Sequence, residues 1–159
     1  MPISYRLPIS LETVTNAAGN SLSVLVIDEE PEILSFLARI LDSNGIRALL
    51  ARDAGEAIGI AKRGYLPIDL VLTDVLLRPD ATVPDIGSGP ELVDRLRQMR
   101  PLLRALYMSA HLDRDAIRIE LLDRGLFHTS KSSDHRGLIE SIRTAAMRPI
   151  QKAHGLGGR

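Results

Sequence analysis

Short runs of aliphatic residues alternate with amphipathic segments along most of the chain. Five of the runs carry apolar residues at both odd and even positions, which is typical of strands that are buried on both faces. These predicted strands are LSVLVI (22–27), IRALLA (46–51), IDLVLTDV (68–75), LRALYMSA (103–110) and LFHTS (126–130). A sheet with one face in water would show a regular alternation of apolar and polar residues instead. The pattern therefore predicts a parallel sheet that is covered on both sides.

The segments between these runs have apolar residues at helical spacing. Pro31 opens the first helix, apolar residues recur at positions 33, 36, 37, 40 and 41, and Asn44-Gly45 ends it. Further helices are predicted from 54 to 63, from Pro90 to just before Pro101, from 113 to 125 and from 133 to 147. A short helix over 11–18 is also predicted, ahead of the first strand.

This alternation predicts an α/β fold, with a doubly wound five-stranded parallel sheet, helices on both faces and right-handed crossovers. One domain is expected over 21–147, preceded by an N-terminal extension over 1–20 and followed by a flexible, Gly-rich tail over 148–159. In open sheets of this class, the ligand site lies beyond the carboxyl ends of the strands, where the winding direction switches. Candidate chemistry is therefore sought at those strand ends.

Composition narrows the function classes. Twenty basic and twenty acidic residues cancel, so the chain has no overall basic field for nucleic acid. The absence of Cys excludes disulfides, thiolate catalysis and Cys-ligated zinc. No apolar run approaches the roughly 20 residues of a membrane span, and the first ten residues lack a signal-peptide pattern. We expect a cytoplasmic protein with neither nucleic acid nor membrane as a partner.

Charged and hydroxyl side chains follow four of the predicted strands. The acidic run Asp28-Glu29-Glu30 follows the first strand, and Asp74, Ser109 and Lys131 stand at or after the ends of the third, fourth and fifth. The acidic groups could hold Mg²⁺ through hard oxygen ligands, and Asp74 could then act as a nucleophile toward phosphorus. Taken singly, each has a simpler reading: the acidic run complements a helix dipole, and Lys131 is a surface lysine.

The order of these motifs resembles the receiver domain of two-component response regulators. The resemblance rests on VIDEEP (26–31), DLVLTDVLL (69–77), LYMSA (106–110) and FHTSK (127–131), and it covers residues 21–147. It implies a flavodoxin-like strand order 2-1-3-4-5. It also implies that Asp74 accepts a phosphoryl group from a histidine kinase or a histidine phosphotransfer protein.

The resemblance assigns further roles as well. Mg²⁺ would be held by Asp28, Glu29, Asp74 and the backbone carbonyl of Leu76, with Ser109 and Lys131 contacting the phosphoryl group. Ser109 and His128 would be the switch residues. The face made by 113–125, 126–130 and 133–147 would change its partner preference and could form a homodimer. Such a protein is a phosphoacceptor rather than an enzyme, with at most self-phosphorylation from small phosphodonors and slow autodephosphorylation.

Four features depart from the family pattern. Glu29 replaces the more usual second aspartate, His128 stands at the aromatic switch position, and Ser132 follows Lys131 where proline is usual, so a trans bond is expected there. The stretch 78–88 is a long loop beside the site. These departures keep a second reading open, a non-phosphorylated pseudo-receiver that acts as an interaction or dimerisation module. A phosphohydrolase with an Asp nucleophile is a third reading, but Leu76 stands where it would need an acid-base partner.

Overall fold

The computed structural model describes residues 15–16, 18–109, 127–130 and 135–148. Five strands form one sheet in the order β2-β1-β3-β4-β5, and all neighbouring pairs are parallel. The strands are β1 (Ser23–Ile27), β2 (Arg47–Ala51), β3 (Leu70–Asp74), β4 (Arg104–Ser109) and β5 (Phe127–Ser130). This confirms the predicted α/β class and the 2-1-3-4-5 order.

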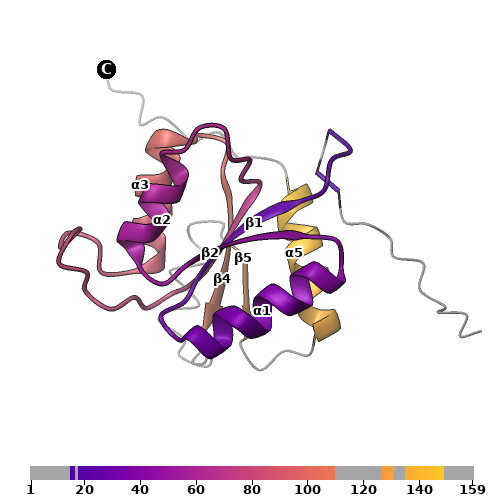
Figure 1. The fold of residues 1–159 in the computed structure, drawn as a ribbon, viewed down its shortest axis with the longest axis horizontal. Helices are drawn as coiled ribbons and strands as arrows, with labels where there is room; N and C mark the ends of the chain where they lie inside the picture. Colours follow the sequence, from indigo (N-terminus) through magenta and orange to yellow (C-terminus); the bar gives the residue numbers. More distant parts are fainter. Residues whose placement is uncertain (1–14, 17, 110–126, 131–134, 149–159) are drawn as a thin grey trace, which may run out of the picture.

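Helices cover both faces of the sheet, as predicted. α1 (Pro31–Ser43) and α5 (His135–Met147) lie on one face, and α2 (Ala54–Ala61) and α3 (Gly89–Met99) lie together on the other (Figure 1). The helix predicted over 113–125 lies outside the described residues, as do residues 133 and 134 of the last predicted helix. Within the part of the chain that the structure describes, no helix is long and apolar enough to cross a membrane.

Alternation along β1 explains why its aliphatic run is continuous. Val24 and Val26 are fully buried in the core between the sheet and the α1/α5 layer, whereas Leu25 and Ile27 are fully buried in the core on the α2/α3 side. Successive side chains of a strand point to opposite faces, so a strand with a core on each side is apolar at every position. Both faces of β1 are covered by core residues, so a ligand can reach this strand only at its end.

Local capping sets the helix boundaries. Pro31 occupies the first turn of α1, which ends at Asn44 and a left-handed Gly45 with φ 69°. The Asp53 side chain accepts the N–H of Glu56 at the start of α2. These signals place each helix close to its predicted bounds, although α2 is two residues shorter than predicted.

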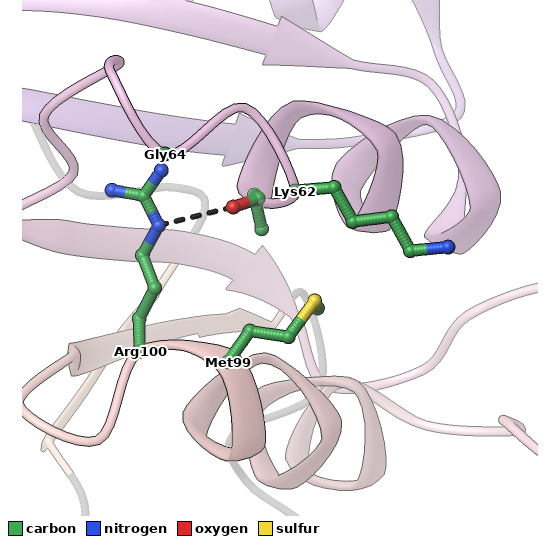
Figure 2. Close-up of a pocket in the computed structure, with 5 residues that line it drawn as sticks. Lys62, Gly64, Met99 and Arg100 are labelled. Carbon is green, nitrogen blue, oxygen red and sulfur yellow. Dashed lines mark hydrogen bonds between the residues drawn. The ribbon is translucent and has the colours of Figure 1, made fainter.

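The ends of α2 and α3 are joined by one arginine. The Arg100 guanidinium donates to the carbonyl oxygens of Ala61 at 3.2 Å, Leu66 at 2.6 Å and Arg63 at 2.8 Å. Figure 2 shows Arg100 reaching across a cleft that is also lined by Lys62, Gly64 and Met99. This cleft lies where helices return to the amino ends of the strands, so its polar contacts serve the packing of α2 on α3.

The short helix predicted over 11–18 is wrong for the residues of that segment that the structure describes. Thr15 pairs with Ser21 in an antiparallel bridge, and the Asn16 side chain accepts the N–H groups of Ala18 and Asn20, both at 3.0 Å. Gly19 has φ 80°. An asparagine that bonds to its own following backbone competes with a helix, so the segment turns instead.

Candidate functional site

Asp28 and Asp74 stand side by side at the carboxyl ends of the neighbouring strands β1 and β3. Ile27 of β1 aligns with Thr73 of β3, so the residue after each one stands at the same step of the ladder. Neighbouring strands lie roughly 4.8 Å apart. Val26 and Leu72, two residues earlier in each strand, are in the same core, so strand alternation gives both aspartates the same facing direction. The two carboxylates therefore belong to one site at the carboxyl edge of the sheet.

Asp28 is a buried carboxylate, with only 1% of its surface exposed. Its Oδ1 accepts the backbone N–H of Glu30 at 2.9 Å, and its own N–H donates to the Ala51 carbonyl of β2 at 3.2 Å. Burying a carboxylate is costly unless hydrogen bonds or a cation compensate it. The turn that leads into α1 supplies one such bond and fixes the orientation of the carboxylate.

Asp74 is more accessible than Asp28. It is half-buried at the end of β3, and its Oδ1 accepts a long hydrogen bond of 3.4 Å from the N–H of Leu76. The next residue along the chain, Val75, continues the ladder by donating to the Met108 carbonyl of β4 at 3.2 Å. A partly exposed carboxylate at the rim of the sheet is placed where a reactant can approach it.

The backbone of Asp74 packs directly against the first residue of α3. The N–H of Gly89 donates to the Val75 carbonyl at 2.8 Å. A Cβ at this glycine would overlap with the Asp74 carbonyl oxygen and lie 3.1 Å from its carbon, and it would be 3.2 Å from Cγ2 of Thr73. Only glycine allows this approach. The sequence reasoning missed this contact, although a Gly-Pro pair at a helix start after a long loop was its signal.

Glu29 is paired with a cation from the long loop. Nε of Arg78 lies 3.0 Å from Oε2 of Glu29, with 81% of the Arg78 side chain and 38% of the Glu29 side chain exposed. Glu30, the third acid of the run, is exposed at the N-cap of α1 and makes no side-chain capping bond. The three acids thus differ: Asp28 is buried, Glu29 is ion-paired and Glu30 faces solvent.

The loop 78–88 is fixed to the start of α2. Asp80 accepts hydrogen bonds from the N–H of Gly55 at 2.9 Å, the N–H of Thr82 at 2.9 Å and the Thr82 hydroxyl at 2.7 Å. The bonds from Thr82, followed by that from Gly55, hold the pKa of Asp80 below its usual value. A Cβ at Gly55 would meet Thr82 Oγ1 at 2.6 Å and Asp80 Oδ2 at 2.8 Å. Loop and helix therefore fit closely.

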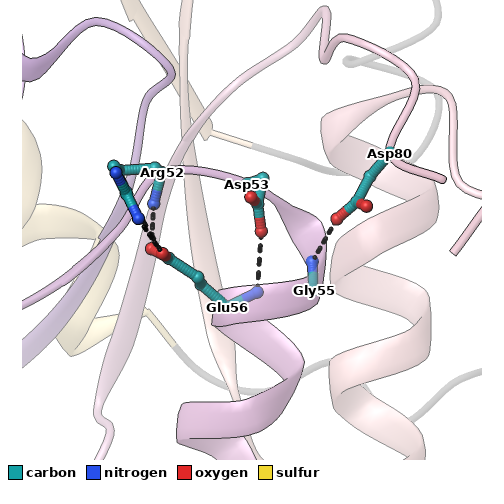
Figure 3. Close-up of polar contacts among 5 residues, drawn as sticks. All are labelled: Arg52, Asp53, Gly55, Glu56 and Asp80. Atoms are coloured by element: carbon teal, nitrogen blue, oxygen red, sulfur yellow. Dashed lines mark hydrogen bonds and ion pairs between the residues drawn. The ribbon is translucent and has the colours of Figure 1, made fainter. Parts of the chain in front are cut away.

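The same end of α2 carries an ion pair on its outer side. Figure 3 shows Arg52 and Glu56 facing each other, with Asp53 capping the helix and Asp80 bonding to Gly55 beside them. Arg52 Nη2 lies 2.9 Å from Glu56 Oε1. The hydrogen bonds from Arg52 lower the pKa of Glu56. The carboxylates of Asp53 and Asp80 thus accept backbone N–H groups at the start of α2, and Asp80 belongs to the loop that follows Asp74.

Comparison with known proteins identifies the fold and the family together. The family model described as the response regulator receiver domain matches residues 24–143. The chain belongs to this family. A receiver domain protein from Clostridium thermocellum matches with a TM-score of 0.65 and 25% identity, over 79% of this chain and 94% of that one. A CheY-like receiver from Methanospirillum hungatei gives a TM-score of 0.64 at 21% identity, over 79% and 93%.

Among curated proteins, the receiver is similar to the probable transcriptional regulatory protein TcrX of Mycobacterium tuberculosis. The identity is 34% over 94 residues, which is 59% of this chain and 36% of TcrX. Across five curated relatives, the chain spans between 35% and 54% of the relative's length. The likeness therefore concerns the receiver, a signalling domain of two-component systems, and not the rest of those proteins.

The remaining predicted site residues of the receiver lie on β4, on β5 or beyond it. Ser109 is the last residue of β4 and aligns with Ser130, and His128 aligns with Tyr107. The backbone of Ser109 thus ends at the same sheet edge as Asp74, because Asp74 itself aligns with Met108. Lys131 directly follows β5 and lies outside the described residues, as does Ser132.

The donors at the edge suit Mg²⁺, although they do not form a complete protein cage. Within 15–16, 18–109, 127–130 and 135–148, no three His, Asp or Glu side chains gather as a metal-binding group. Mg²⁺ usually keeps several waters and is bound through one or two carboxylates together with phosphate oxygens. Asp28 and Asp74 supply two carboxylates at one level, which matches that need. Glu29 faces Arg78 instead.

Proposed function

We propose that this receiver is a phosphorylatable signalling switch in which Asp74 accepts a phosphoryl group with Mg²⁺ present. The donor would be the phosphohistidine of a histidine kinase or of a histidine phosphotransfer protein. The observation that carries the proposal is the shared level of the buried Asp28 and the accessible Asp74 on neighbouring strands. One carboxylate is shielded and serves to bind a cation, and the other is open to a reactant.

The transfer itself is a substitution at phosphorus. A carboxylate oxygen of Asp74 forms the new bond to phosphorus while the bond from phosphorus to the histidine nitrogen breaks, and the imidazole keeps that electron pair. Asp28, Asp74 and the Leu76 carbonyl would hold Mg²⁺, with Glu29 as a further ligand. The cation would supply neutralisation of the phosphoryl charge. In this proposal the Ser109 hydroxyl donates to a phosphoryl oxygen, and Lys131 adds a second positive charge.

The proposed switch follows from the position of β4 and β5. Movement of Ser109 toward the phosphoryl group would alter the strand next to it, on which His128 stands. The neighbouring face, made of β5, α5 and the helix predicted over 113–125, would then bind a protein partner or a second copy differently. The chain would act as a phosphoacceptor and not as an enzyme, apart from self-phosphorylation and slow autodephosphorylation, and would have no nucleic acid partner.

The Glu29–Arg78 ion pair favours one alternative. A pseudo-receiver would use the same fold as a constitutive interaction or dimerisation module, and an acid that is already neutralised by arginine is compatible with a site that needs no metal. The two functions differ in whether Asp74 gains a phosphoryl group.

Intact mass after incubation with acetyl phosphate and Mg²⁺ separates these functions. Wild type is expected to gain one phosphoryl group that is lost at alkaline pH, as an acyl phosphate would be. Asp74→Asn is expected to gain none, whereas Asp85→Asn, which removes a loop carboxylate that pairs with Arg95, should behave as wild type. No gain in wild type, with acetyl phosphate or with a cognate kinase, would leave the pseudo-receiver as the function. Equal gain in Asp74→Asn would place the phosphoacceptor elsewhere.

A further inference from the structure

We propose that Arg78 competes with the divalent cation for Glu29, so that the ion pair lowers the affinity of the receiver for Mg²⁺ and cation binding separates the pair. This inference rests on the proposed function, because the cation site is the one at Asp28 and Asp74. It concerns a residue of the long loop to which the family resemblance assigns no role.

The loop holds Arg78 in place from both sides. Leu76, two residues before it, forms an antiparallel bridge with Ser88. Asp80, two residues after it, is bonded to the N–H of Gly55 at the start of α2. A chain fixed at both of these points carries the arginine on a short and restrained span. The pair with Glu29 at 3.0 Å is thus supported by the backbone as well as by its own attraction.

Glu29 is the acid for which Arg78 and the divalent cation would compete. It directly follows the buried Asp28, and 38% of its side chain is exposed. A carboxylate that is paired with a guanidinium has part of its charge neutralised by that partner, and the same carboxylate is then a weaker ligand for a metal ion. The guanidinium also brings a positive charge to the residue next to Asp28, and this charge would repel a divalent ion bound by Asp28.

The size of the effect follows from the exposure of the pair. Exposed ion pairs contribute a factor of about two to five in an equilibrium constant, and added salt weakens them. Because coupling between two binding events is reciprocal, the ion pair weakens cation binding by the same factor by which the bound cation weakens the ion pair. Loss of Arg78 is therefore expected to raise Mg²⁺ affinity about two- to fivefold at low salt, with a smaller gain at high salt.

The test is calorimetric titration of the purified chain with MgCl₂, without any phosphodonor. Wild type is compared with Arg78→Ala and with Arg95→Ala, a control that changes net charge equally and breaks the exposed Arg95–Asp85 pair at the other end of the loop. The expected result is tighter Mg²⁺ binding in Arg78→Ala and unchanged binding in Arg95→Ala. In wild type, the Nε–H resonance of Arg78 in an NMR spectrum should shift as Mg²⁺ is added.

The outcomes separate this inference from the proposed function. Mg²⁺ binding that is lost in Asp74→Asn but is equal in wild type and Arg78→Ala would overturn the competition and leave the cation site standing. Weaker binding in Arg78→Ala would overturn it too, and would make Arg78 a residue that positions Glu29. If neither wild type nor Arg78→Ala bound Mg²⁺, the cation site and the competition would both fail.

Discussion

Gly89 touches the backbone carbonyl of Asp74, so the first residue of α3 is built against the proposed phosphoacceptor. The hydrogen bond from Gly89 to Val75 closes the same contact at 2.8 Å. The long loop 78–88 therefore starts and ends at one place, and its length does not loosen the site.

Gly89→Ala is expected to destabilise the receiver by about 1–3 kcal/mol, because the new methyl group must push α3 away from Asp74. Gly59→Ala is the matched control, since that glycine lies exposed within α2 and a Cβ there meets nothing within 4 Å. The control should gain about 0.5–1 kcal/mol from the better helix propensity of alanine. Urea denaturation measures both. Equal stabilities for the two variants would mean that the contact at Asp74 is not close.

Loss of the Asp80 charge is expected to weaken the hydrogen bonds between the loop 78–88 and α2. The pKa of Asp80 is lowered in the folded protein, so the contribution of its hydrogen bonds is present above the unfolded value of 3.8 and is lost as the pH falls through the folded value. Asp80→Asn removes this charge at every pH. Amide hydrogen exchange at Gly55 and Thr82 should therefore be faster in the variant than in wild type at neutral pH. Similar protection in the two proteins would show that Asp80 does not hold the loop.

Arg52 should set the titration of Glu56. The side-chain hydrogen bonds from Arg52, followed by the one from its backbone N–H, lower the pKa of Glu56 from its ordinary 4.5. Arg52→Ala removes only the side-chain bonds, so it is expected to return the midpoint part of the way toward that value. NMR titration of the Glu56 side-chain carboxyl carbon measures the midpoint directly. Arg63→Ala is a suitable control. Arg63 accepts a hydrogen bond from Arg100 through its backbone carbonyl, and this bond survives the substitution. A midpoint in Arg52→Ala that matches wild type would disprove the assignment.

The fold could be predicted from the sequence because its main signals are local and repeat along the chain. Val24 to Ile27 are aliphatic at every position, which only a strand with a core on both faces requires, and Pro31 and Gly45 mark the ends of α1. The strand order came from the family resemblance and is confirmed by the sheet. The turn at Asn16 was mispredicted because a side-chain hydrogen bond outweighed the helix propensity of its neighbours.

The convergence of Asp28 and Asp74 could be predicted from the sequence, whereas the contacts around them could not. Asp28 and Asp74 follow predicted parallel strands, so their convergence follows from the fold rule alone. The pairing of Glu29 with Arg78 and the approach of Gly89 to Asp74 depend on how a long loop folds back, and no periodicity in the loop encodes that. The roles of all the predicted site residues stay predictions, as do Mg²⁺ and the limits 1–20, 21–147 and 148–159; these residues are Asp28, Glu29, Asp74, Leu76, Ser109, His128 and Lys131.

The most direct test of the central claim is to locate the phosphoryl group in the chain. Borohydride reduces an aspartyl phosphate to homoserine, which marks the modified position in a peptide mass spectrum after treatment with acetyl phosphate and Mg²⁺. The account predicts homoserine at position 74 alone, with none when Mg²⁺ is chelated and much less in Asp28→Asn. Homoserine at another aspartate, or the same yield at position 74 with and without the cation and Asp28, would contradict it.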